Sequence, residues 1–179
     1  TMGISNLGGS TNISTIIPAK DFVYIVTSDV TFSPIASTDK IWKSDGTSVG
    51  TSLVYAFETA SGLTNVGVYY SVSAHKKNYS VEGNTLYFSA YDATNGKELW
   101  KTDGTASGTT LLKNIYPEKN SSSPNAFINF NGQLYFTASD DKNGVELWTS
   151  NGTTAGTVMV KNINDGSSGS IPYAMHIYN

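Results

Sequence analysis

The sequence predicts an all-β protein made of repeated units, because one twelve-residue phrase occurs three times. The phrase occupies residues 40–51, 98–109 and 146–157, and each copy contains Trp followed by Asp-Gly-Thr or Asn-Gly-Thr. Short segments rich in β-branched and aromatic residues surround every copy, and turn-forming residues separate these segments. The spacing from Trp100 to Trp148 is 48 residues. A period of this size indicates units that bury their apolar surface against one another.

Each unit is expected to contain four short antiparallel strands, named A to D in chain order. The segments end at Gly, Asn, Asp or Ser, which favour turns. We predict strands at residues 13–17, 22–27, 40–43 and 52–56 in the first unit; at 78–81, 85–90, 97–101 and 109–114 in the second; and at 126–129, 133–138, 145–149 and 157–162 in the third.

Both faces of each sheet are expected to be buried. Apolar residues stand next to each other in strands B and C, as in Leu134-Tyr135-Phe136 and Leu147-Trp148, and successive side chains of a strand point to opposite faces. Sheets that pack face against face around an axis need this double coverage, and units of about 40 to 50 residues are typical of them. We therefore predict a β-propeller-like array of four-stranded antiparallel blades.

The array is predicted to comprise three complete blades with a terminal strand at each end. Propellers close with about four to eight blades, so we expect the ring to be completed by the rest of a longer chain or by other subunits. The predicted division is residues 1–9 for the outer strand of a preceding blade, 10–57 for the first blade, 58–77 for an insertion loop, 78–115 for the second blade, 116–163 for the third blade and 164–179 for the inner strand of a following blade.

Composition narrows the possible partners. The chain of 179 residues has 11 Lys, no Arg and a formal net charge of -3. It therefore lacks the basic clusters that bind nucleic acid. The absence of Arg also disfavours sialic acid and phosphorylated ligands, which guanidinium groups normally bind. The absence of Cys excludes disulfides and thiol ligands. No apolar run reaches the length of about 18 residues that spans a membrane, so we expect no membrane insertion.

The residues of the repeated phrase are expected to be structural. The Asp-Gly-Thr segment lies between strands C and D, where Gly can supply a positive φ and the Asp side chain can accept backbone hydrogen bonds. The Asn of the third copy keeps such a bond but loses the charge that catalysis or metal binding would need. We expect each Trp in the core between blades. The structural positions are Trp42, Asp45 and Gly46; Trp100, Asp103 and Gly104; and Trp148, Asn151 and Gly152.

Two turn sequences, residues 92–96 and 140–144, join strands B and C. Their Asp and Asn oxygens are hard ligands suited to calcium. Neither segment has the full EF-hand pattern, and the Asn-Gly pair in each favours a hairpin. We therefore predict no cofactor, with calcium as the less favoured alternative.

The sequence carries few catalytic signatures. His75 and His176 are the only His residues, are about 100 residues apart, and have no nucleophile-elbow motif to accompany them. Glu98 and Glu146 recur in register, which favours a role in strand C over a glycosidase carboxylate pair. The sequence therefore predicts a protein without enzyme activity.

Variation in length is confined to two segments. Relative to the other intervals, five extra residues fall within 29–39 and ten fall within 58–78. Because successive strands alternate in direction, both segments are expected at the same edge of the array. Loops that vary on a repeated scaffold often carry its function. The candidate ligand-binding residues at this edge are Asp29, Asp39, Tyr69, Tyr70 and His75.

The two adjacent Tyr residues, Tyr69 and Tyr70, are the basis for a ligand prediction. Exposed Tyr beside Ser and Asn suits neutral sugars or a partner protein, because the ring offers flat apolar contact and the hydroxyl a hydrogen bond. The alternative is that these residues extend an irregular strand or fill a central channel.

The segments Glu98-Leu-Trp-Lys-Thr-Asp-Gly-Thr105 and Glu146-Leu-Trp-Thr-Ser-Asn-Gly-Thr153 resemble the ELWxxDGT repeat of large bacterial proteins, most of them exported. The first copy departs from this pattern with Lys40-Ile41. The resemblance covers nearly the whole chain and implies an extracellular or cell-surface location. With the candidate residues above, it suggests a non-catalytic binding or adhesion module that contacts carbohydrate or protein. The alternatives are a structural subunit of a larger secretion or surface complex and a glycan-active enzyme.

Overall fold

The computed structural model describes residues 11–32, 35–60, 78–118 and 120–172, together with Met175 and Ile177. These residues form twelve β-strands and no helix, which confirms the all-β prediction. Within the same ranges, therefore, no helix is long and apolar enough to cross a membrane. The strands form three four-stranded antiparallel sheets, and in each sheet neighbouring strands follow chain order.

The strands A to D predicted for each unit are all present. The first sheet consists of β1 (Thr11–Pro18), β2 (Val23–Phe32), β3 (Ile35–Ser44) and β4 (Ser52–Ala60). The second sheet consists of β5 (Tyr79–Glu82), β6 (Thr85–Asp92), β7 (Gly96–Thr102) and β8 (Thr110–Lys113). The third sheet consists of β9 (Asn125–Phe130), β10 (Gln133–Asp140), β11 (Gly144–Ser150) and β12 (Val158–Lys161).

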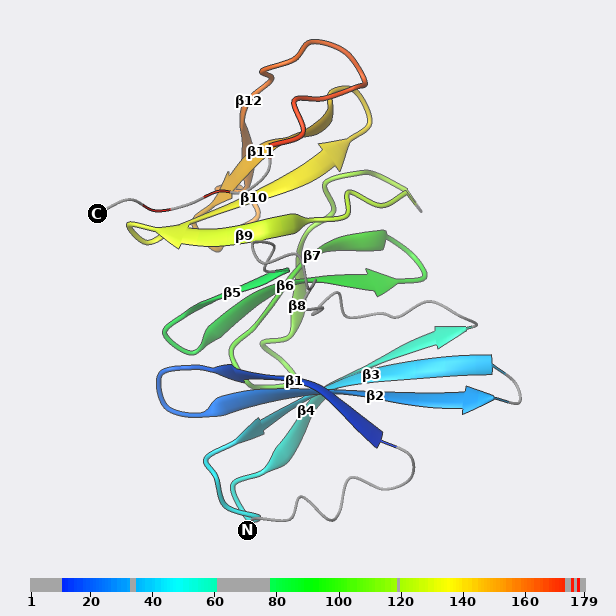
Figure 1. The fold of residues 1–179 in the computed structure, drawn as a ribbon, viewed down its shortest axis with the longest axis vertical. Coiled ribbons are helices and arrows are strands. Elements are labelled where there is room, and N and C mark those ends of the chain that lie inside the picture. The colour runs from blue at the N-terminus through cyan, green and yellow to red at the C-terminus, as the bar shows by residue number, and fades with distance from the viewer. Residues whose placement is uncertain are drawn as a thin grey trace.

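The five extra residues of the first unit lengthen a hairpin and do not form a separate loop. β2 and β3 stay paired from Asp29 opposite Thr38 to Phe32 opposite Ile35. This segment is rich in β-branched and aromatic residues, which favour strands. The hairpin therefore projects beyond the equivalent ends of β6 and β7 (Figure 1).

Most of the sequence assigned to the expected terminal strands lies outside the described residues. This holds for residues 1–9 and for residues 173–174, 176 and 178–179. The described residues from Asn162 to Pro172 are in turns and irregular structure, with no strand.

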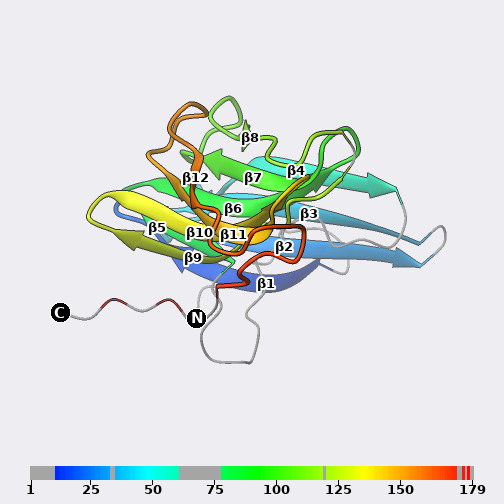
Figure 2. The same cartoon turned by 90° about the horizontal axis from the view of Figure 1, so that it is seen from above.

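The three sheets are stacked along the long axis of the molecule, and the second sheet lies between the other two (Figure 1). Viewed from above, the sheets lie over one another (Figure 2). One buried apolar cluster joins the first and second sheets and includes Tyr24 and Phe88. Another joins the second and third sheets and includes Leu99 and Phe136. The second sheet contributes to both clusters, so both of its faces are buried, as predicted.

The connection between the second and third sheets passes directly against the turn that joins β6 to β7. Ser123 N donates a hydrogen bond to Lys97 O (3.1 Å). A Cβ atom on Gly96 would lie 1.8 Å from the carbonyl oxygen of Asn120, so only glycine allows this approach. Gly144 of the third sheet is in the equivalent contact with the segment after β12.

Replacing Gly96 with Ala is therefore expected to destabilise the fold more than replacing Gly83. Both glycines have a positive φ, 77° and 59°, so both substitutions strain the backbone. A Cβ atom on Gly83 meets nothing within 4 Å, whereas one on Gly96 overlaps main chain. In urea titrations, Gly96→Ala should lower the free energy of unfolding by about 1–3 kcal/mol more than Gly83→Ala. Equal losses would contradict this account of the connection.

Candidate functional site

The turns between the third and fourth strands of each sheet are closed hydrogen-bond networks. In the first sheet, Asp45 Oδ1 accepts from Thr47 N (2.9 Å) and from Thr47 Oγ1 (2.7 Å). Thr47 Oγ1 accepts from Gly50 N (2.9 Å), and Thr51 Oγ1 donates to Thr47 O (2.6 Å). The carboxylate thus serves the turn, as predicted. The turn glycines Gly46, Gly104 and Gly152 have φ values of 93°, 87° and 82°.

The same bonds recur in the other two turns, including the one that has Asn in place of Asp. Asp103 Oδ1 accepts from Thr105 N (2.9 Å) and Thr105 Oγ1 (2.6 Å). Asn151 Oδ1 accepts from Thr153 N (3.1 Å) and Thr153 Oγ1 (2.7 Å). The network therefore needs a side-chain oxygen at this position and does not need a charge.

Trp100 and Trp148 lie in the cores between sheets, as predicted. The Trp100 ring packs edge-on against Phe57 of β4, with centroids 5.2 Å apart, and Trp148 belongs to the core between the second and third sheets. Trp42, at the same position in the first sheet, is only partly buried. Its Nε1 donates to Thr27 Oγ1 (3.1 Å) within its own sheet. Among the described residues, no preceding sheet covers this face of the first sheet.

The turns considered as calcium sites are also hydrogen-bonded internally. Asp92 Oδ1 accepts from the amides of Thr94 and Asn95, both at 2.8 Å, and Asn95 Oδ1 accepts from Asn114 Nδ2 (3.0 Å). Asp140 accepts equivalent bonds in the third sheet. In the described parts of the chain, no three His, Asp or Glu side chains converge as a metal site would require. The Asp side chain thus closes each hairpin, and the Asn side chain joins the hairpin to the residue that follows its fourth strand.

Glu98 and Glu146 have a role that sequence reasoning missed, since it assigned them only to strand C. Each carboxylate is buried and holds the segment that follows its own sheet. Glu98 accepts from Ile115 N (2.8 Å), Ser122 N (2.9 Å) and Ser122 Oγ (2.6 Å). Glu146 accepts from Ser170 N (2.8 Å) and from the Ser170 hydroxyl. The two serines are also 48 residues apart, which is the signal that could have revealed the pairing.

The pKa values of these two glutamates shift in opposite directions. Burial raises the pKa of Glu98, and hydrogen bonds from Ser122 and Ile115 only partly oppose it. Burial also acts on Glu146, but hydrogen bonds from Ser170 and Ile163 outweigh it and hold that pKa below its usual range. Both side chains are fully buried, but among the described residues the second sheet has a sheet on each side and the third on one side only, so burial disfavours the charged form of Glu98 more strongly.

The first sheet departs from the other two at this same position, because Lys40 stands where the other units have Glu. Lys40 Nζ donates to Asp29 Oδ2 (2.6 Å) across the β2–β3 hairpin. Asp39 is buried and accepts from Ser28 Oγ (2.5 Å). At this position the first sheet thus has a Lys–Asp ion pair between β2 and β3, where the other two sheets have a Glu that holds the following segment.

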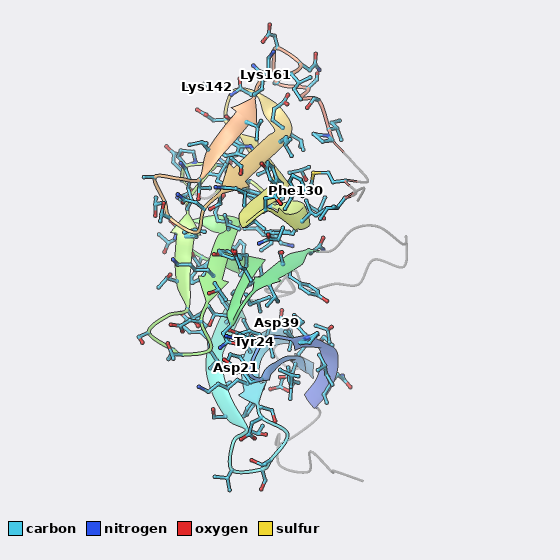
Figure 3. All side chains as sticks on the ribbon, turned by 90° about the vertical axis from the view of Figure 1, so that its left-hand side faces the viewer. Asp21, Tyr24, Asp39, Phe130, Lys142 and Lys161 are labelled. Atoms are coloured by element: carbon cyan, nitrogen blue, oxygen red, sulfur yellow. The ribbon has the colours of Figure 1, made fainter. Side chains whose placement is uncertain are left out.

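The structure brings together two of the five candidate ligand-binding residues. Asp29 and Asp39 both lie at the base of the projecting part of the hairpin, on opposite faces, because Asp39 is paired with the residue next to Asp29. Asp39 lies on the side of the first sheet that faces the second (Figure 3). The other three candidates, Tyr69, Tyr70 and His75, lie outside the described residues.

A shallow pocket of about 330 Å³ opens beside the turn of the second sheet. Tyr87, Lys101 and Asp103 are among its lining residues. Lys101 Nζ already donates to Gly152 O (2.8 Å), and Asp103 is held by its own turn. Of the two charged groups in this pocket, Lys101 therefore serves the contact between the second and third sheets and Asp103 serves its own turn.

In the second and third units, the repeated phrase thus supplies three structural parts: a closed turn, a core Trp and a Glu that secures the next segment. Comparison with models of known protein families and with curated proteins found no match for the chain. The positions at which the three units differ are therefore the best guide to what the protein does.

The capping role of Glu98 gives a stability prediction. Gln at this position has one acceptor oxygen, and its amide group faces the backbone donors, so a buried hydrogen bond is lost. Glu98→Gln should lower the free energy of unfolding by about 1–3 kcal/mol in urea titrations. Glu118→Gln is the matched control, because Glu118 lies exposed on the same connection. An equal effect of the two substitutions would disprove the capping role.

The turn networks give a pH prediction. Asp103→Asn should change the free energy of unfolding at neutral pH by only about 0.5 kcal/mol, since Asn151 makes the same bonds. Hydrogen bonding from Thr105 holds the pKa of Asp103 below its usual range. The stability that this charge confers is therefore present above the unfolded-state pKa and is lost as the pH falls through the folded-state pKa.

Asn does not titrate, so the Asp103→Asn protein should lose less stability than wild type from about pH 5 down to about pH 2. Asp103→Ala is the comparison, because it removes the acceptor and should be less stable than both at neutral pH. Parallel acid-unfolding curves for wild type and Asp103→Asn would show that this carboxylate does not contribute.

Proposed function

We propose that this chain is a non-catalytic, carbohydrate-binding module of an exported bacterial surface protein, formed as part of a β-propeller-like array. Contact would be made through the edge that carries the end of the β2–β3 hairpin and residues 58–77. The observation that carries this proposal is that the first unit departs from the repeat at this one edge.

Three departures coincide there. The β2–β3 hairpin is longer than the equivalent hairpins. β4 continues to Ala60, which pairs with Ala36 at the far end of β3. Lys40 pairs with Asp29, whereas the equivalent Glu residues of the other units fasten the following segment. A repeat that changes length, charge and anchoring in one place favours a specialised contact surface there.

The chemistry of this edge supports a neutral, hydroxyl-rich ligand. Lys40 and Asp29 neutralise each other, so their pairing offers little attraction to a strongly charged ligand. The chain has no Arg for a carboxylate or phosphate clamp. Tyr69 and Tyr70 in the adjacent insertion offer flat rings with hydroxyl groups, which is the side-chain chemistry that neutral sugars stack on.

The use of the repeated carboxylates supports binding without catalysis. Glu98 and Glu146 accept backbone and hydroxyl hydrogen bonds from the segments that follow their sheets. The Asp side chains of the turns accept bonds from their own Thr residues. A glycosidase would need two carboxyl groups close together and open to substrate, and none of these groups is arranged in that way.

A neutral-glycan array tests the proposal. The wild-type chain should bind at least one class of neutral glycan, and Tyr69→Ala combined with Tyr70→Ala should reduce that binding at least about tenfold, the loss expected when stacking worth ~1–2 kcal/mol is removed. Tyr116→Ala is the matched control, because Tyr116 lies in the equivalent connection one unit later. Absence of wild-type binding to every neutral glycan would refute the carbohydrate assignment.

A further inference from the structure

Apolar positions that are buried between sheets recur, exposed, on the outer face of the third sheet. Leu112 in β8 is 3% exposed and lies in the core between the second and third sheets. Val160, at the same place in the repeat 48 residues later, is 48% exposed. Ile115 is 6% exposed, and its counterpart Ile163 is 61% exposed. The third sheet therefore presents an interface face without the sheet that covers it in the second unit.

The outer face of the first sheet shows the reciprocal pattern. Tyr79 pairs with Phe88 in the second sheet just as Ile16 pairs with Ile25 in the first. Tyr79 is 9% exposed in the core against the first sheet, whereas Ile16 is 54% exposed. Trp42, as described above, is also less buried than the Trp residues of the other two sheets. In the second and third sheets, the equivalent face packs against the preceding sheet. In the first sheet this face is the outer one.

The two outer faces are the two halves of an interface that the chain already forms twice. At both internal interfaces, the face that carries Leu112 or its counterpart in one sheet packs against the face that carries Trp100 or its counterpart in the next sheet. In the described stack of three sheets, the outer face of the third sheet is of the first kind, the outer face of the first sheet is of the second kind, and neither packs against another sheet. Apolar faces of this kind on a soluble protein mark interaction sites.

We propose that the chain associates head to tail with a second copy of itself, so that the outer face of the third sheet packs on the outer face of the first sheet of the next copy. Such an interface is heterologous, because the two contacting surfaces differ. Repetition of the contact gives a ring if the rotation closes and a filament if it does not.

Polar groups at the interface between the second and third sheets have counterparts at the outer faces. Lys113 Nζ donates to Thr157 O (2.6 Å), and Thr154 Oγ1 donates to Leu112 O (2.8 Å), so the turn of the third sheet is fastened to β8.

Lys161 is the counterpart of Lys113 and lies exposed at the end of the stack (Figure 3). In the turn of the first sheet, Ser48 and Thr51 are the counterparts of Thr154 and Thr157, and Ser48 keeps the hydroxyl. In the proposed assembly, Lys161 donates to Thr51 O of the next copy and Ser48 donates to Val160 O.

This interface lies on the sheet faces, whereas the proposed carbohydrate contact lies at a sheet edge. The two proposals therefore stand on different observations. Failure of the glycan array leaves the association untouched, and the reverse also holds.

Sedimentation velocity over a concentration series measures the association. Wild type should form dimers and larger species that increase with concentration. Val160→Asp places a charge on the outer face of the third sheet, and Ile16→Asp places one on the outer face of the first, so each variant alone should remain monomeric. Val158→Asp is the matched control. Val158 lies on the same strand and is 46% exposed, and its counterpart Thr110 is exposed even beside a neighbouring sheet.

Mixing the variants distinguishes head-to-tail packing from non-specific association. The Ile16→Asp protein keeps the outer face of its third sheet, and the Val160→Asp protein keeps that of its first sheet. An equimolar mixture should therefore give a 1:1 heterodimer that grows no further. Thermal unfolding and near-ultraviolet circular dichroism check that both variants remain folded.

Three outcomes would overturn the proposal. One is a wild-type chain that stays monomeric at every concentration. Another is a mixture of folded variants that forms no heterodimer. The third is association that Val160→Asp and Val158→Asp weaken equally.

Discussion

Each four-stranded sheet of this protein has two apolar faces, and the rest of the structure depends on covering both. Burying one large aliphatic or aromatic side chain contributes about 1.5–3 kcal/mol, and each interface between sheets buries several. A single sheet of four short strands has no other way to remove this surface from water. Among the described residues, only the second sheet is packed against a sheet on both sides.

The repeated phrase secures these interfaces at three levels. Its Trp fills the core, and its Glu fastens the segment that leads to the next sheet. Its turn glycine has no side chain, so an aromatic ring of the preceding sheet can pack directly against the main chain of the turn. A Cβ atom on Gly104 would lie 2.7 Å from Phe22, and one on Gly152 would lie 2.6 Å from the Tyr87 hydroxyl. The turn therefore forms part of the contact between sheets as well as joining two strands.

The first sheet packs against the second through the same kind of core as the other interface, but it differs from the other sheets at one edge. Tyr24 is fully buried and its hydroxyl donates to Asn84 O (2.6 Å) of the second sheet, so the interface is intact. At the edge, Lys40 cannot accept the hydrogen bonds that Glu98 accepts, since an ammonium group only donates. A scaffold can vary such an edge without disturbing the buried faces.

Sequence alone determined the strands, their order, the closed turns and the apolar character of both faces of each sheet, because these follow from local turn chemistry and from the two-residue period of a strand. The tertiary structure decided which groups meet across longer distances. Glu98 and Ser122, 24 residues apart, pair only because the connection folds back over its own sheet. The extra residues around Asp29 became strand and not loop because a pairing partner lay opposite. Burial of Leu112 and exposure of Val160 depend on which sheet stands beside each, and a single repeat does not contain that information.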